Sequence, residues 1–233
     1  MSDRDAMREP LPLVEGQWLD QPMFHARYEA MPIGTRAELI NGVVFMPDPF
    51  GVGHARARPP VIAWLDYYRE QAPGLEGLVN VSTILGAKSE LQPDVVLRIL
   101  PEFGGQTRVE VEWLHGPPEL VAEVAQETRY VDLGPKFDEY ERAGVPEYVV
   151  RAMEPDAVHW FVLRNGRFVE LPPGPDGIYR SQMFPGSWLD PQALIRGDTR
   201  RLCAVVDLGC ATPEHATFVA RLAAVRDQAQ GPT

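Results

Sequence analysis

The sequence predicts an α/β domain with a mixed β-sheet, and three observations support this fold class. Apolar runs flank an Asn-Gly dipeptide at 41–42 and again at 165–166, which is the strongest short-range signal for a β-hairpin. The run at 118–125, apart from its two glutamates, is apolar on both faces, as expected for a central strand. A helix predicted over 135–144 separates this strand from another at 145–151, and this order indicates a mixed sheet with helices on its faces.

The other elements can be assigned in order along the chain. Apolar residues recur at helical spacing after Pro59-Pro60, so we expect a helix to begin there and end near residue 71. The helix at 135–144 has proline in its first turn and glycine at its end, as helices commonly do. The remaining expected elements are a helix at 22–30, a hairpin at 37–46, strands at 77–85, 93–100 and 108–113, a hairpin at 157–171, and helices at 198–208 and 213–228.

Length and composition fit one main domain with extensions. The chain has 233 residues, of which 45% are hydrophobic, enough to bury a sizeable core. We expect a loosely ordered segment at 1–21, the α/β domain at 22–195 and a helical extension at 196–233.

Several features point to a cytoplasmic protein. No run approaches 18 apolar residues, so a membrane span is not expected, and the charged start lacks the apolar region of a secretory signal. Cys203 and Cys210 are seven residues apart in a region expected to be helical, which separates them by about 10 Å, too far for a disulfide. We therefore expect reduced thiols.

The net charge limits the ways in which this chain can bind nucleic acid. With 33 acidic and 22 basic residues the formal charge is −11, whereas proteins that bind duplexes present basic surfaces. A nucleic-acid role would need a local basic strip or few phosphate contacts. Arg56 and Arg58, with Arg108, are candidates for such a strip, which is thin for duplex DNA.

Charged residues within apolar segments are the main functional signal. Asp94 opens an apolar run, Glu123 lies inside another, and Glu38 precedes Leu39-Ile40. A buried carboxylate that has no partner costs many kcal/mol, so such groups are normally paired, hydrogen-bonded or bound to a metal. These acids are therefore candidates for a cation site.

A lysine is expected to lie beside these acids. In the helix at 135–144, helical periodicity places Lys136 on the apolar stripe with Phe137 and Tyr140. The same periodicity assigns Asp138, Glu139, Glu141 and Arg142 to the opposite side. Lys136 should therefore point towards the sheet, where its ammonium needs a carboxylate partner.

Together these residues have the chemistry needed for phosphodiester hydrolysis. Mg²⁺ (or Mn²⁺) typically binds one or two carboxylates together with water and phosphate oxygens, and Asp94 and Glu123 could supply the carboxylates. A bound metal lowers the pKa of water and neutralises phosphate charge. Lys136 would orient the water or stabilise the transition state, and Glu38 would assist.

The ordered motifs resemble a known family, the branch of the PD-(D/E)xK nuclease superfamily described as putative restriction endonucleases. The resemblance covers about residues 24–194. It rests on Glu38-Leu39-Ile40-Asn41-Gly42-Val43-Val44, Gln92-Pro93-Asp94, Pro118-Glu119-Leu120-Val121-Ala122-Glu123-Val124, Asp132-Leu133-Gly134-Pro135-Lys136, and Tyr140 with Ala143-Gly144-Val145-Pro146-Glu147-Tyr148. It implies a restriction-endonuclease-like fold, a homodimer and metal-dependent cleavage of nucleic acid, DNA above all.

The resemblance also assigns roles to individual residues. Asp94 matches the first acid of the superfamily motif, Glu123 the second, and Glu38 an acid found upstream in many members. The usual lysine position, two residues after the second acid, is Ala125 here, and Lys136 is the proposed replacement.

Three residues are secondary candidates for the site. His54 matches a histidine that often follows the first hairpin; it would contact phosphate or transfer a proton, or else be an ordinary loop or helix-cap histidine. Gln92 belongs to the Asp94 motif. We expect Tyr140 to be a core aromatic residue rather than a catalytic phenol, and it is kept as a secondary candidate.

Two other functions remain open at this stage. The net charge and Ala125 favour an inactive nuclease-fold protein that binds nucleic acid or protein. Alternatively, the chain could be a structural partner protein in which the acids only form ion pairs. Buried ion pairs also shift pKa values without any catalytic role.

Overall fold

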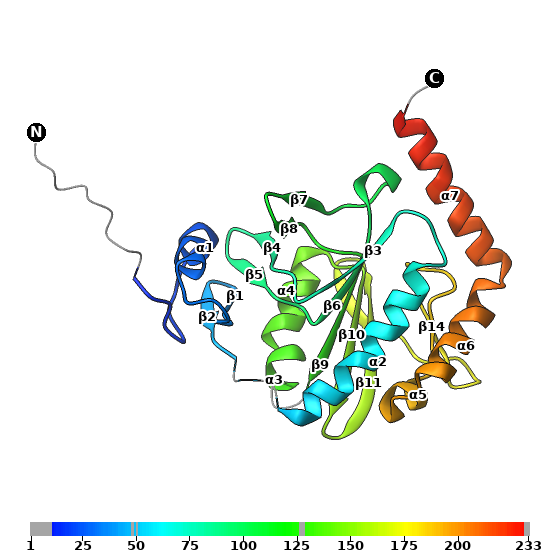
Figure 1. Ribbon diagram of the computed structural model, residues 1–233, viewed down its shortest axis with the longest axis horizontal. Helices are drawn as coiled ribbons and strands as arrows, with labels where there is room; N and C mark the ends of the chain where they lie inside the picture. The colour runs from blue at the N-terminus through cyan, green and yellow to red at the C-terminus, as the bar shows by residue number, and fades with distance from the viewer. Residues whose placement is uncertain (1–10, 48, 50, 126–128, 231–233) are drawn as a thin grey trace, which may run out of the picture.

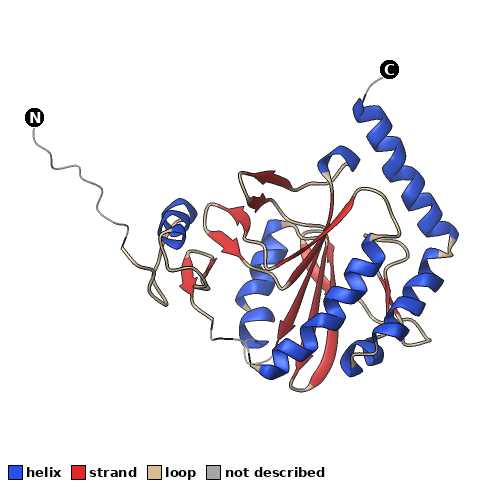
Figure 2. Cartoon of the chain, viewed as in Figure 1, coloured by secondary structure: helices blue, strands red, loops and turns tan. Residues whose placement is uncertain are grey.

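The computed structural model describes residues 11–47, 49, 51–125 and 129–230 (Figures 1 and 2). Within these residues the strands form two six-stranded sheets and a small two-stranded one. None of the described helices is both long and apolar enough to cross a membrane.

The central sheet forms the middle of the domain. Its strand order is β12-β11-β10-β9-β6-β3, with β9 and β10 parallel and every other neighbouring pair antiparallel. The sheet is therefore mixed, as the sequence predicted. Its strands are β3 (Leu75–Val79), β6 (Val95–Ile99), β9 (Leu120–Ala125), β10 (Glu147–Met153), β11 (Asp156–Arg164) and β12 (Arg167–Glu170).

A second sheet, called the peripheral sheet below, packs beside the central one. Its strand order is β2-β1-β5-β4-β8-β7, with β4 and β8 parallel. Its strands are β1 (Glu38–Ile40), β2 (Val43–Phe45), β4 (Thr83–Gly86), β5 (Ser89–Leu91), β7 (Arg108–Glu110) and β8 (Trp113–His115). The separate β13 (Tyr179–Arg180) and β14 (Trp188–Leu189) pair with each other.

Helices cover both faces of the central sheet (Figure 2). One face packs on α2 and on the C-terminal helices in a large core that includes Trp64 and Trp160. The other face packs on α4 and the peripheral sheet around Tyr140 and Tyr148. The helices are α1 (Gln21–Glu29), α2 (Val52–Arg69), the 3-10 helix η1 (Pro101–Phe103), α3 (Arg129–Asp132), α4 (Pro135–Ala143), α5 (Pro191–Arg196), α6 (Thr199–Cys210) and α7 (Pro213–Gln230).

Both predicted Asn-Gly hairpins are confirmed. Asn41 and Asn165 have φ angles of 48° and 52°, and the glycine after each is also left-handed, which matches the tight turn expected there. The helix at 135–144 is confirmed as α4, and Gly144 ends it with a φ of 88°. Cys203 and Cys210 both lie on α6 and are free thiols.

Four details of the predicted elements are wrong. α2 begins at Val52, and Pro59 and Pro60 lie inside it, because burial of Val61 and Trp64 keeps the chain helical despite the lost amide bonds. The run at 77–85 is split between two sheets at Asn80, whose φ is 53°. The strand at 108–113 turns at Val111 and forms the β7–β8 hairpin.

The fourth error concerns α4, where Glu139 is buried rather than exposed. A helical position three residues after Lys136 faces nearly the same way as the lysine, so Glu139 is also turned inwards. There it accepts a hydrogen bond from Ser89. Of the predicted loose segment 1–21, residues 1–10 lie outside the described part of the chain, and Trp18 forms a β-bridge with Val43. The C-terminal extension is helical where it is described, through α6 and α7.

Candidate active site

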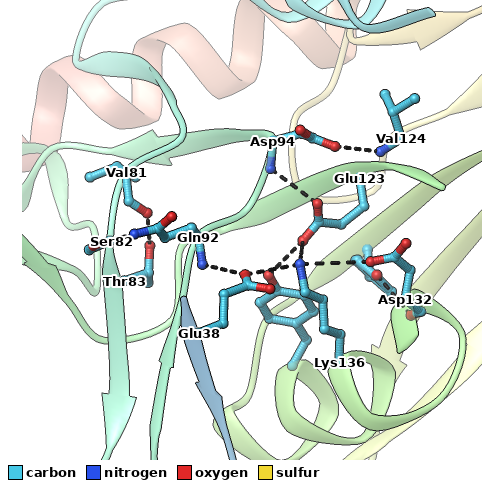
Figure 3. Close-up of polar contacts among 12 residues, drawn as sticks. Glu38, Val81, Ser82, Thr83, Gln92, Asp94, Glu123, Val124, Asp132 and Lys136 are labelled. Atoms are coloured by element: carbon cyan, nitrogen blue, oxygen red, sulfur yellow. Dashed lines mark hydrogen bonds and ion pairs between the residues drawn. The ribbon is translucent and has the colours of Figure 1, made fainter. Parts of the chain in front are cut away.

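A cavity of about 450 Å³ lies where the two sheets meet α3 and α4. Six of the seven residues proposed from the sequence line it: Glu38, His54, Gln92, Asp94, Glu123 and Lys136. The seventh, Tyr140, contacts Glu123. The structure therefore brings residues from five separate segments to one place. Figure 3 labels Glu38, Gln92, Asp94, Glu123 and Lys136 among them.

Lys136 is surrounded by carboxylates (Figure 3). Its Nζ lies 3.0 Å from Oε1 of Glu38, 3.0 Å from Oε1 of Glu123 and 3.7 Å from Oδ1 of Asp132. The lysine side chain is only 8% exposed. An ammonium has three donors and no acceptor, so it can donate to all three carboxylates. Their negative charges stabilise the positive charge of Lys136, which burial alone would disfavour.

Local structure explains why these groups converge. Alternation along β9 turns Val121, Glu123 and Ala125 towards α4. α4 begins at Pro135, so Lys136 is in its first turn and reaches back to the end of β9. The β1–β2 hairpin places Glu38 beside them, and the backbone amide of Gln92 donates to Oε1 of Glu38 at 2.6 Å.

Asp94 is joined directly to the Glu123 segment. The Asp94 amide donates to Oε2 of Glu123 at 3.1 Å, and the Val124 amide donates to Oδ2 of Asp94 at 2.8 Å. These reciprocal bonds, each from a backbone amide to a carboxylate, join the residue before β6 to the last part of β9.

α2 supplies two basic groups on the other side of Asp94. Nε2 of His54 donates to Oδ2 of Asp94 at 3.2 Å, and Nε of Arg58 lies 3.7 Å from Oδ1. His54 and Arg58 are four residues apart and so share one face of the helix. His54 is thus a buried partner of Asp94 rather than an ordinary loop histidine.

The environment separates the proton affinities of the two acids. Burial raises the pKa of Glu123 well above its ordinary value; Lys136 opposes this, while the carboxylates of Asp94, Asp132 and Glu38 add to it. Burial also acts to raise the pKa of Asp94, but the hydrogen bond and charge of His54, together with the Val124 amide and the charge of Lys136, outweigh it, and the Asp94 pKa is lowered. Two neighbouring carboxylates with different proton affinities are typical of acid–base sites.

Lys136 and Tyr140 keep their protons. Burial acts to lower the pKa of Lys136, yet the charges of Glu123, Glu38 and Asp132 raise it well above the ordinary value. Burial raises the pKa of Tyr140 well above its ordinary value, and the charge of Glu123 adds to this. Both side chains therefore act as donors at Glu123.

Gln92 has a supporting position. Its side-chain amide donates to the hydroxyl of Tyr28 at 2.6 Å and to that of Ser82 at 3.1 Å. Its backbone amide, as noted, holds Glu38. These contacts connect α1 and the peripheral sheet to the site.

The sequence reasoning missed two residues of the site. Asp132 contacts Lys136 from α3, and its signal was the spacing of four residues before the lysine. Arg58 had been considered only as part of a basic strip, although its spacing of four from His54 indicated a shared face. These two four-residue spacings become informative only when the bounds of the helices are known.

The donor set at Asp94 and Glu123 fits a hard divalent cation. The two carboxylates line one cavity and interact electrostatically, and Mg²⁺ needs only one or two protein carboxylates besides water and phosphate. Among the described residues no group of three or more His, Cys, Asp or Glu side chains is arranged to hold a metal. A cation here would therefore take most of its ligands from water and substrate.

Comparisons with known proteins agree with this picture. A family model described as "Uma2: Putative restriction endonuclease" matches residues 24–192. Among solved structures, the chain resembles a crystal structure described as "a putative nuclease belonging to DUF820" from Anabaena variabilis ATCC 29413. The two share 13% identity with a TM-score of 0.57, over 73% of this chain and 96% of the other. None of the curated proteins matches the chain.

Proposed function

We propose that this chain, which belongs to the Uma2 family of putative restriction endonucleases, is a Mg²⁺- or Mn²⁺-dependent nuclease that hydrolyses phosphodiester bonds in nucleic acid, DNA above all. One observation carries the proposal. Asp94 and Glu123 line one cavity and are linked by a hydrogen bond from the Asp94 amide to the Glu123 carboxylate, and the ammonium of Lys136 lies 3.0 Å from Glu123. This is the combination of groups that hydrolysis of a phosphodiester requires.

Each side chain has a specific role in this proposal. Asp94 and Glu123 would hold the cation. When bound, it supplies neutralisation of phosphate charge and a more acidic water. His54 keeps Oδ2 of Asp94 in place, and Tyr140 does the same for Oε1 of Glu123.

Lys136 is a hydrogen-bond donor rather than a base. Three carboxylates raise its pKa, so it keeps its proton at neutral pH. It can orient the attacking water or stabilise the negative charge that develops on phosphorus oxygens. Glu38 and Asp132 hold the ammonium in position. Ala125 occupies the usual lysine position, and Lys136 reaches the same acid from α4.

Metal binding provides the first test. We expect Mn²⁺ titrated by calorimetry to bind the wild-type protein and to bind Asp94→Ala much more weakly. Equal and undetectable binding in both would count decisively against the metal site.

Cleavage provides the second test. Plasmid and single-stranded substrates would be incubated with Mn²⁺ and either wild-type protein or Lys136→Met. Activity should require the lysine. Activity that survives the substitution would point to a contaminant or to a different residue.

A second function, that of an inactive nuclease-fold protein that binds nucleic acid or protein, is favoured by two observations. The net charge is −11, and the lysine position of the superfamily motif is occupied by Ala125. Metal binding without cleavage of any substrate would favour this alternative.

The proposal includes a homodimer in the cytoplasm. The free thiols of Cys203 and Cys210 are in keeping with a reducing compartment. Light scattering coupled to size-exclusion chromatography measures the oligomeric state, and a monomer mass would reject the dimer.

A further inference from the structure

The depth of the acidic groups restricts the shape of a substrate. Glu38, Asp94 and Glu123 are only 4%, 4% and 3% exposed, and they line a cavity of about 450 Å³. This volume is in the range of pockets for small molecules, roughly 300–1,000 Å³. The phosphates of a base-paired duplex stay on a stiff cylinder, so they do not reach groups buried this deeply unless a strand separates from its partner. A single strand or an extruded nucleotide can enter such a pocket.

The charge of the cavity walls leads to the same conclusion. Among the described lining residues the acids are Glu15, Glu38, Asp94, Glu123 and Asp132, whereas the permanent cations are Arg36 and Lys136. Lys136 is already surrounded by carboxylates. Duplex binding depends on many Lys and Arg contacts to phosphates. A substrate of this cavity must therefore gain binding free energy from another source.

The rim of the cavity offers that source. Tyr130, on α3, lines the cavity with 76% of its surface exposed, and it lies two residues before the buried Asp132. Phe45, Met46 and Pro47 also line the cavity, at the end of the β1–β2 hairpin. Unpaired bases stack on exposed aromatic rings, and such stacking tolerates any base, so Tyr130 offers a stacking surface in a cavity that also has apolar lining residues.

We propose that the cavity takes an unpaired nucleotide of a single-stranded nucleic acid, with its phosphate near Asp94 and Glu123 and its base against Tyr130. The position of the phosphate rests on the proposed nuclease function. The preference for an unpaired strand rests on the depth, charge and aromatic rim of the cavity, so it can be tested by binding alone.

Fluorescence anisotropy tests the preference directly. The probes are labelled thymidine and uridine homopolymers of about eight nucleotides, within the usual single-strand site size, and the thymidine strand annealed to its complement. Ca²⁺ replaces Mg²⁺, and gels confirm that the strands stay intact. We expect both single strands, or one of them, to bind more tightly than the duplex. The comparison of thymidine with uridine distinguishes DNA from RNA.

Substitution of Tyr130 tests the stacking contact. Tyr130→Ala should weaken single-strand binding by about 5- to 150-fold, and Tyr130→Phe should restore it because the ring remains. Leu208→Ala is the matched control, because Leu208 is also exposed, at 59%, but lies on α6 and does not line the cavity. Circular dichroism checks that each variant is folded.

Three results would overturn the proposal: a duplex that binds as tightly as the single strands, wild-type affinity in Tyr130→Ala, or no binding to any of the probes. A parallel incubation with Mg²⁺ separates this proposal from the nuclease proposal. If Tyr130-dependent binding is found and no strand is cut, the pocket assignment stands and the nuclease function fails. If strands are cut but the duplex binds more tightly than the single strands, the nuclease function stands and the pocket assignment fails.

Discussion

The Nζ atom of Lys136 lies 3.0 Å from Oε1 of Glu38 and 3.0 Å from Oε1 of Glu123, so one ammonium joins acids from the peripheral and central sheets. Removal of one partner from a buried ion pair leaves charge without compensation, which costs more than the pair itself contributes. This relationship makes Lys136 important for stability as well as for chemistry.

Lys136→Met should destabilise the fold by about 3–5 kcal/mol, because buried carboxylates lose their shared cation. Lys88→Met is an apt control, since Lys88 is the only other lysine in the chain and is exposed. Its substitution should change stability by no more than about 0.5 kcal/mol. Urea denaturation of both variants measures the difference, and equal losses would show that the ammonium has no special role.

Asp94→Asn should abolish stabilisation by Mn²⁺. A ligand at a concentration of about 100 times its dissociation constant stabilises the folded state by about 2.7 kcal/mol, which thermal unfolding detects readily. The asparagine keeps a side-chain oxygen for the Val124 amide, so the fold should survive. Asp66→Asn, at an exposed acid of α2, is the control. A rise in melting temperature with Mn²⁺ in Asp94→Asn that matched the wild type would place the metal elsewhere.

Tyr140→Phe should move the acid limb of the pH–rate profile to higher pH. The Tyr140 hydroxyl donates to Oε1 of Glu123 at 2.9 Å, and its loss disfavours the ionised carboxylate, which raises the pKa of Glu123 further. Stability should fall by about 1–3 kcal/mol. Tyr148→Phe loses a comparable bond, to the carbonyl oxygen of Asp132, without touching the acid. If both variants shift the profile equally, the hydroxyl of Tyr140 does not act on Glu123.

Glu147→Gln should flatten the pH dependence of stability. Burial raises the pKa of Glu147, although hydrogen bonds from Ser181, Met183 and Gln182 oppose this. Between the unfolded pKa and the raised folded pKa, the folded protein holds a proton that the unfolded chain has released. Stability therefore falls as pH rises through this window, which begins near 4.5. The glutamine has no proton to lose, so its variant should equal or exceed the wild type at neutral pH.

Glu141→Gln is the control with the opposite sign. The amide of Phe168 and the guanidinium of Arg167 lower the pKa of Glu141, so its contribution is present above the unfolded pKa and is lost as pH falls. This variant should be less stable than the wild type at neutral pH and approach it in acid. Chemical denaturation across pH distinguishes the two glutamates, and parallel curves would contradict both assignments.

The sequence predicted the site best where it depends on local periodicity. Alternation along 120–125 and the helical stripe of Lys136 and Tyr140 required only a correct choice of element, and both elements are confirmed. The hairpin around Asn41 and Gly42 likewise follows from backbone conformations that few residues adopt.

The parts that the sequence did not predict depend on contacts between distant segments. Pro59 and Pro60 normally disfavour a helix interior, and only packing of α2 on the central sheet explains their place in it. The contacts of Arg58 with Asp94 and of Asp132 with Lys136 join different elements, so the four-residue spacings that point to them become informative only when the bounds of the helices are known. The roles assigned to the site residues stay predictions.

The division of the site between two sheets has an effect on how this protein can change over evolution. Glu38 comes with the peripheral sheet, Glu123 with the central sheet, and a single nitrogen on α4 satisfies both. A substitution that loosens the packing of one layer on the other would separate reactive groups without altering any of them. Natural selection on thermal robustness and selection on turnover would consequently act on the same few atoms.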